Sequence, residues 1–275
     1  MIGAAGVVAA LAALVLAATA PTPTVDRVDE HAAWSRLVRQ VELGPRPAGS
    51  TASRKLAAQL KAELPNGRFQ AVPDGLRNVV GSVPGRDPSR TVVVGAHYDT
   101  KDLPGFVGAN DGAGGTALVV ELARSIKPGQ LRPSVVFILF DGEESPDDNH
   151  DFLKTGLRGS KVAARLHKRA EAMILLDFVA DRDLSLPREG FSNPALWRKL
   201  RVAARRVGTA AVFPPGTQAT IADDHLPFRE LGVPSIDLID FDYPCWHRTC
   251  DNLSRVSKRS LDAVGETVYE LLRSF

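Results

Sequence analysis

The sequence lacks an excess of charge of either sign. It contains 34 Lys and Arg residues against 32 Asp and Glu residues, which gives a net charge of +2 over 275 residues. A balance this even gives no reason to expect nucleic acid or an anionic membrane surface as a partner. Internal repeats and long low-complexity tracts are also missing, and 44% of the residues are hydrophobic. This composition suits one globular domain with a full-sized core, which we assign to residues 25–275.

Cysteine is scarce as well, since the chain has only Cys245 and Cys250. In an exported protein, a disulfide across this short loop would hold the segment that carries His247. Two free, partly buried thiols are the alternative. Metal ligation by these thiols is not expected, because the chain offers enough other ligands.

Charged residues are missing from residues 2–20, which consist almost entirely of Ala, Val, Leu, Gly and Thr. The run ends in Ala18-Thr19-Ala20, the small-x-small pattern that precedes signal-peptide cleavage. It lacks the positively charged start that is usual for such a peptide. An uncleaved signal anchor is therefore the alternative, because the run is nearly long enough to span a bilayer. Either form of residues 1–20 predicts an extracytoplasmic catalytic domain, which is secreted or anchored to a membrane.

Strands and helices are expected to alternate along the rest of the chain. Apolar runs predict strands at residues 78–83, 91–96, 134–140, 172–176 and 233–239. Periodicity and capping residues predict helices at 25–43, 50–64, 114–126, 161–168, from 193 onward and 256–272. This order predicts an α/β fold, a three-layer α/β/α sandwich with a mixed, mainly parallel sheet. The fully apolar strands indicate that the sheet is buried on both faces.

Five segments of this pattern end on a potential metal ligand. In an open α/β sheet the ligand site lies outside the carboxyl ends of the strands, so these side chains should converge on one crevice. Imidazole and carboxylate groups together suit zinc. The segments are residues 92–99 with His97 and Asp99, 108–112 with Asp111, 137–144 with Glu143 and Glu144, 173–177 with Asp177, and 245–247 with His247.

The residue types predict different roles at this site. His97 and Asp99 are two residues apart on a strand and point the same way, so Asp99 could accept a hydrogen bond from a metal-bound His97. Of the adjacent acids Glu143 and Glu144, one could bind the metal while the other serves as general base.

Taken singly, each motif has a simpler interpretation. Asp111 or Asp177 could cap a helix, Glu143 and Glu144 could lie on a solvated loop, and His247 could be structural. The glycine-rich turn around Asp111 could cradle phosphate, but it lacks a lysine and the phosphate-loop spacing. The coincidence of five motifs favours a metal site.

A further group of ionisable residues, Asp223-Asp224-His225, precedes an apolar segment. It could lie at the rim of the same crevice. Alternatively, Asp223 or Asp224 could cap a short helix, and the residues alone leave both interpretations open.

These motifs resemble the zinc aminopeptidase and glutaminyl cyclase superfamily, from about residue 44 to the C-terminus. The resemblance implies a zinc exopeptidase-like fold. In aminopeptidases of this type, Asp111 would bridge two zinc ions and Glu143 would activate the bridging water. His97 and Asp177 would complete one zinc site, and Glu144 and His247 the other.

Several stretches look closer to the cyclase branch, namely residues 97–101, 106–109, 157–160, 223–234 and 246–247, the last with Asp251-Asn252 behind it. In cyclases, the positions matching Asp111, Glu144 and His247 hold one zinc. The resemblance implies that the substrate is the N-terminal Gln of a peptide or protein, cyclised to pyroglutamate with release of ammonia. Glu143 would transfer the proton, Asp223 and Asp177 would form an acidic hydrogen-bond network, and Trp246 would line the pocket.

Two departures from the cyclase pattern leave the substrate open. Residues 112–115 read like an aminopeptidase, and residues 145–155 lack the Trp that cyclases place there, where Phe152 could substitute. The resemblance therefore favours a glutaminyl-peptide cyclotransferase with one zinc. A two-zinc aminopeptidase is the alternative. A non-catalytic binding domain on the same fold is less favoured, because every ligand position is filled.

Overall fold

The computed structural model describes residues 20–146 and 151–275. Residues 1–19, which make up nearly all of the predicted signal segment, lie outside the described residues. Within the described ranges, no helix has both the length and the apolar character needed to cross a membrane.

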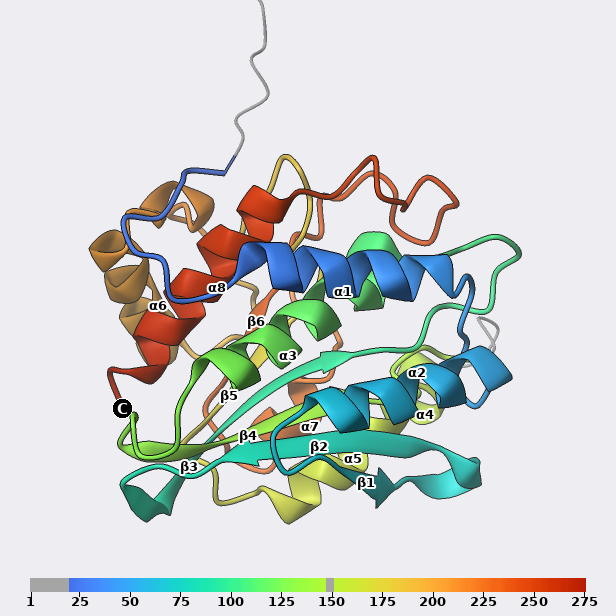
Figure 1. Cartoon of the computed structure of the whole chain (residues 1–275), viewed down its shortest axis with the longest axis horizontal. Coiled ribbons are helices and arrows are strands. Elements are labelled where there is room, and N and C mark those ends of the chain that lie inside the picture. Colours follow the sequence, from blue (N-terminus) through green and yellow to red (C-terminus); the bar gives the residue numbers. More distant parts are fainter. Residues whose placement is uncertain (1–19, 147–150) are drawn as a thin grey trace, which may run out of the picture.

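A six-stranded mixed sheet forms the middle layer of the molecule (Figure 1). The strand β2 is antiparallel to both of its neighbours, whereas β3, β4, β5 and β6 run parallel to one another. The mainly parallel sheet predicted from the sequence is thus confirmed. In spatial order the strands are β1 (Arg68–Ala71), β2 (Arg77–Val83), β4 (Pro133–Phe140), β3 (Asp87–His97), β5 (Ala172–Leu176) and β6 (Ser235–Leu238).

Helices cover both faces of the sheet, because side chains of the central strands alternate between two buried cores. In β3, Val92 and Val94 enter the larger core, while Val93 enters the smaller one. The three-layer sandwich is therefore confirmed. The larger core is covered by α1 (Glu30–Glu42), α2 (Thr51–Glu63), α3 (Gly115–Ser125), α6 (Pro194–Arg206) and α8 (Lys258–Leu272), and the smaller by α5 (Arg158–Leu166) and α7 (Leu226–Glu230).

The long loop after β6 returns across the carboxyl ends of the strands before α8 begins. Cys245 and Cys250 form a disulfide within it, which confirms the prediction of a short-loop crosslink. The crosslink encloses His247, whose φ of 50° lies in the left-handed region that is unfavourable for a non-glycine residue. The disulfide thus helps to hold His247 in a backbone conformation that its own preference would not select.

Candidate metal centre

The parallel strands bring their ends to one edge of the sheet, and the predicted polar side chains meet there. His97 is the last residue of β3, Asp177 directly follows β5, and Glu143 and Glu144 follow the end of β4. All four are buried or nearly so, with 9% exposure at Glu143 and less at the others. The convergence expected from the strand-end rule is present.

Asp111 reaches the same place from a distorted turn, Ala109–Gly114, that leads into α3. The turn depends on Gly112, which has a φ of +90° and packs closely against the chain below. A Cβ at this position would lie 2.8 Å from the carbonyl oxygen of Asp99. Only glycine combines this backbone conformation with so close an approach, so the turn can direct the buried Asp111 toward His97.

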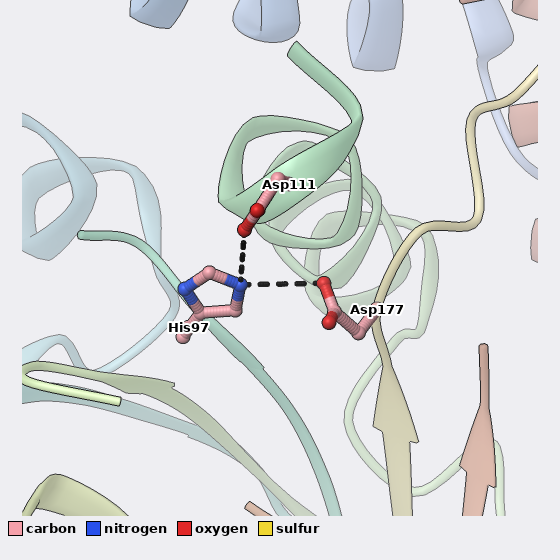
Figure 2. Close-up of side chains that lie close together, drawn as sticks. All are labelled: His97, Asp111 and Asp177. Carbon is pink, nitrogen blue, oxygen red and sulfur yellow. Dashed lines mark hydrogen bonds and ion pairs between the residues drawn. The ribbon is translucent and has the colours of Figure 1, made fainter. Parts of the chain in front are cut away.

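Asp111 stands between two imidazoles, with one carboxylate oxygen facing each. His97 Nε2 lies 3.3 Å from Asp111 Oδ1 and 3.2 Å from Asp177 Oδ1, and both carboxylates point toward the ring (Figure 2). On the other side, His247 Nε2 lies 3.7 Å from Asp111 Oδ2 and 3.2 Å from Glu144 Oε1. Two three-residue groups with the geometry to hold a metal result, and they share Asp111.

The distances within both groups fit zinc. Two ligands at tetrahedral positions, each about 2.1 Å from zinc, lie about 3.4 Å apart, which is close to the His97–Asp177 and His247–Glu144 separations. Asp111 Oδ2 is buried and accepts no hydrogen bond from the described residues. A buried acceptor of this kind is costly unless a proton or cation occupies the space in front of it. The donor set and its unsatisfied oxygen therefore suit a zinc ion.

Asp99 lies beside the site but makes different contacts from those expected. Its Oδ1 atom is 3.8 Å from His97 Nδ1, beyond hydrogen-bond distance. Its two oxygens instead accept hydrogen bonds from the backbone N–H groups of Glu143 and Glu144, each at 3.3 Å. Asp99 thus fixes the turn that presents the two glutamates.

Two buried residues for which the sequence predicted no role hold the Asp111 turn. Asp251 accepts hydrogen bonds from the backbone N–H groups of Asn110 and Asp111 and from the Tyr243 hydroxyl. Arg46 donates to the carbonyl oxygens of residues 98, 107 and 108. Burial lowers the pKa of Arg46 to about 10, against the opposing effect of nearby acids.

The crowding of acids shifts their protonation strongly. Burial, together with neighbouring carboxylates, raises the pKa of Glu143 well above its usual range and that of Asp177 to about 7. Burial lowers the pKa of His97, but the surrounding carboxylates outweigh it and raise this pKa well above its usual value. The site therefore retains protons unless a cation replaces them.

A cavity of about 470 Å³ opens in front of the two metal-binding groups. Its wall includes Glu143, Phe152, Asp223 and Trp246. The Trp246 ring is 47% exposed at the mouth and stacks on His247 with ring centroids 4.6 Å apart. Phe152 lines the cavity, and its substitution for the missing Trp stays a prediction.

Lys101 brings a positive charge into the same cavity. Its Nζ atom lies 3.7 Å from Glu144 Oε2 and donates to the carbonyl oxygen of Ser145. The sequence analysis noted Lys101 only as part of the cyclase-like stretch 97–101.

Asp223 is buried against this cavity and does not cap a helix. The helix α7 begins after His225, and no side chain among the described residues caps it. Behind Asp223 lies a second buried cluster, in which His225 sits 3.3 Å from Glu189 Oε2 and 3.6 Å from Asp237 Oδ2. Asp237 was missed, although an acid inside the apolar strand β6 is a usable signal, because burying it is costly. Glu189 comes from an irregular segment with no sequence pattern of its own.

The sequence was compared with known proteins. A glutaminyl-peptide cyclotransferase from Bothrops jararaca is 29% identical over 218 residues, which cover 63% of this chain and 58% of that relative. The chain spans less than two thirds of the length of the curated relatives that it matches.

Two solved structures share the fold. A glutaminyl cyclase from Porphyromonas gingivalis has a TM-score of 0.80 and 30% identity, covering 91% of this chain and 99% of that one. A leucine aminopeptidase precursor from Bacteroides thetaiotaomicron has a TM-score of 0.82 and 27% identity, covering 92% and 99%. The model of peptidase family M28 matches residues 78–272, a range that holds every residue predicted for the site. The chain belongs to peptidase family M28.

Proposed function

We propose that this protein is a zinc-dependent glutaminyl-peptide cyclotransferase, which converts the N-terminal Gln of peptides or proteins to pyroglutamate and releases ammonia. The observation that carries the proposal is the position of Asp223, a buried acid on the cavity wall that also includes Glu143. Trp246, stacked beside His247 at the mouth, supports it. Similarity both to glutaminyl cyclases and to aminopeptidases is consistent with either chemistry, so these features decide the preference.

Asp111, Glu144 and His247 would hold the single zinc ion of a cyclase, since their ligand atoms lie within 4.8 Å of one another. A zinc ion bound there would act as a Lewis acid toward the γ-carboxamide oxygen of the substrate. All three residues line the cavity, so the Gln side chain would have to enter it to reach the zinc ion.

Cyclisation forms a bond between the substrate's α-nitrogen and its Cδ atom and breaks the bond from Cδ to the amide nitrogen. The α-nitrogen loses a proton and the departing amide nitrogen gains one, which yields ammonia. Glu143 would accept the first proton and deliver the second. A carboxyl group whose pKa is raised by burial is suited to both steps at neutral pH.

Asp223 and Asp177 would bind the α-amino group by hydrogen bonds and orient its lone pair toward Cδ. Both line the cavity together with Glu143. Holding the α-nitrogen in this orientation lowers the entropic part of the activation free energy for ring closure. Trp246 would cover the bound residue and exclude water from the reacting atoms.

A two-zinc aminopeptidase is the second candidate. It is favoured by the completeness of the other metal-binding group, formed by His97, Asp111 and Asp177. In that enzyme Glu143 would take a proton from a water molecule, and the product would be a free amino acid.

We further propose that residues 25–275 form the catalytic domain and that this domain works in an extracytoplasmic compartment. Residues 1–20 would either be cleaved as a signal peptide or remain as a membrane anchor. The Cys245–Cys250 disulfide supports this location, because such bonds persist in oxidising compartments. Recovery of the intact chain from the soluble cytosolic fraction would contradict it.

The test is mass spectrometry of a Gln-initiated and a Leu-initiated peptide, each incubated with purified zinc-loaded protein. Loss of ammonia from the Gln peptide alone, faster than in a protein-free control, would establish the cyclase. Loss of the first residue from the Leu peptide, with two zinc ions per chain by elemental analysis, would establish the aminopeptidase instead. A Glu143→Gln variant controls for contaminating enzymes, since it should be inactive in either case.

A further inference from the structure

The segment that carries Asp223 has no regular structure of its own. Residues 220–223 line the cavity, and α7 begins only at Leu226. Asp223 contributes one backbone contact to that helix start, a hydrogen bond from Leu226 N–H to its carbonyl oxygen. Within the segment, the Asp223 carboxylate accepts a hydrogen bond from the backbone N–H of Asp224, so its position follows the backbone, which contacts outside the segment must hold.

Glu189 holds this segment at both ends. One carboxylate oxygen, Oε1, accepts a hydrogen bond from the backbone N–H of Ile221 at 2.9 Å. The other, Oε2, lies 3.3 Å from Nε2 of His225. Ile221 and His225 are the second residues before and after Asp223, so a single side chain brackets the acid.

The same carboxylate is anchored on its own side. Oε1 also accepts from the backbone N–H of Phe191 at 2.8 Å, and Oε2 from the Ser192 hydroxyl at 3.0 Å. The Ser192 hydroxyl oxygen in turn accepts from the backbone N–H of Asp237 in β6. Glu189 thus ties the Asp223 segment to the edge of the sheet.

Close packing holds the segment around Gly190 against the segment that begins at Thr220. A Cβ on Gly190 would lie 2.7 Å from the Thr220 side chain and 3.0 Å from its backbone nitrogen. Glu189 itself is fully buried. Burial raises the pKa of Glu189, but hydrogen bonds from His225 and the two backbone N–H groups outweigh it and hold the pKa below its usual range. Glu189 is therefore an ionised acceptor of three hydrogen bonds, with the His225 ring nitrogen 3.3 Å away as a fourth polar contact.

We propose that Glu189 is a positioning residue for Asp223, because it fixes both ends of the segment that presents this acid to the substrate. The inference rests on the proposed function, in which Asp223 binds the substrate's α-amino group. Glu189 lies behind the cavity wall and touches no reacting atom.

The test compares Glu189→Gln with Glu266→Gln. Gln keeps the size of Glu189 but removes its charge and turns one acceptor oxygen into an NH₂ donor. With the remaining oxygen on the Ile221 and Phe191 N–H groups, the NH₂ group replaces Oε2 and removes the carboxylate contact to His225 and the hydrogen bond from the Ser192 hydroxyl. Glu266 is also fully buried and accepts hydrogen bonds from Arg27 and Val28, far from the cavity lining, so it is the matched control. We expect Glu189→Gln to lower kcat/KM by about 10–100-fold, mainly through kcat, with zinc content unchanged. Glu266→Gln should lower the Tm and leave kcat/KM unchanged.

A readout independent of activity is hydrogen–deuterium exchange measured by mass spectrometry. Glu189→Gln should speed exchange in residues 219–226, which lose the carboxylate contact to His225, and leave residues 172–176 in β5 as in the wild type. Unchanged exchange at 219–226 would overturn the proposal. If Glu189→Gln does not fold, Glu189→Asp replaces it, since its shorter side chain keeps the charge but cannot reach both Ile221 and His225.

A double-mutant cycle separates positioning from a general structural effect. If Glu189 acts through Asp223, Glu189→Gln should lower kcat/KM little further in an Asp223→Asn background. Equal losses in both backgrounds would overturn the proposal.

Wild-type protein that shortens the Leu peptide and does not cyclise the Gln peptide would refute the cyclase alone. The cycle would then be measured on Leu release, and the exchange experiment would stand as it is.

Discussion

Asp251 is the residue whose loss should most clearly show that the metal site depends on its supporting hydrogen bonds. Its carboxylate joins the His247 loop to the Asp111 turn, with distances of 2.8 Å to Asn110 N, 3.1 Å to Asp111 N and 2.8 Å to the Tyr243 hydroxyl. The side chain is fully buried. One carboxylate therefore positions two of the three ligands in the Asp111–Glu144–His247 group.

Asp251→Ala leaves these three donors buried without a partner. Each buried donor without an acceptor lowers the free energy of unfolding by about 1–3 kcal/mol. Water that enters the space left by the side chain recovers part of this loss. Burial and Asp111 raise the pKa of Asp251 to about 6, so removing the acid also removes an unfavourable buried charge. The net expectation is a loss of about 3 kcal/mol in the free energy of unfolding, or roughly 6–12 °C in Tm for a chain of this size. Asp251→Asn keeps one acceptor oxygen and should lose about half as much.

Zinc affinity should fall by about 10–100-fold in Asp251→Ala, because the backbone that directs Asp111 and His247 is no longer fixed. Competition with a chelating dye measures the affinity, and thermal unfolding of the zinc-free protein measures stability separately. Asn252→Ala is the matched control on the same loop, since among the described residues its side chain accepts hydrogen bonds only from Ser254. The reasoning is refuted if Asp251→Ala binds zinc as tightly as Asn252→Ala does.

Three further perturbations test the site and the fold. Glu143→Gln should lower kcat by about 10²–10⁴-fold with zinc content unchanged, because it removes the proton carrier; steady-state kinetics and elemental analysis check this. Removal of zinc by a chelator should abolish activity and lower the Tm, and added zinc should restore both, since a ligand at 100 times its Kd stabilises the folded state by about 2.7 kcal/mol. Asp262→Asn should stabilise the protein at about pH 8 and have little effect near pH 4, as judged by urea unfolding. Burial, with Glu30, Glu266 and Asp26, raises the pKa of Asp262 from 3.8 to about 7, so the folded state binds this proton more tightly and loses stability as pH rises between those values. Equal effects of Asp262→Asn at both pH values would contradict this interpretation.

Elements with a local cause could be predicted from the sequence. Ser50 caps α2 through a hydrogen bond from Ser53 N–H, and the predicted range 50–64 matches the helix closely. The apolar run 172–176 is the strand β5 without change. The helix predicted from residue 25 begins instead at Glu30, because the Asp29 side chain accepts from Ala32 N–H and caps it there. Capping and continuous hydrophobicity are properties of neighbouring residues, so they can be read from the chain.

Elements that depend on tertiary contacts could not be predicted in this way. The edge strand β1 has the sequence Arg-Phe-Gln-Ala and is mostly exposed, so it lacks an apolar face. Its strand conformation depends on backbone hydrogen bonds to the antiparallel partner β2. In the candidate site, the ligands were found because strand ends share one edge of the sheet. The roles of Glu189 and Asp251 were not predicted, although Asp251 belongs to the cyclase-like pattern, because these roles depend on segments that approach them in space.

The number of zinc ions and the choice of reaction are linked through the charge of the site. Five carboxyl groups line the cavity, from Asp111, Glu143, Glu144, Asp177 and Asp223. Two zinc ions supply four positive charges and a substrate's α-ammonium group a fifth, so all five acids can be ionised, and an ionised base is what activation of water requires. A single zinc ion, the ammonium group and Lys101, whose Nζ atom lies 3.7 Å from Glu144 Oε2, supply four positive charges and leave one negative charge without a counterpart. Protonation can then neutralise the excess, and the raised pKa values of Glu143, Asp177 and Asp223 show where protons are held most readily. A retained proton next to the substrate is what the departing ammonia needs, so the metal count would select between hydrolysis and cyclisation on the same set of side chains.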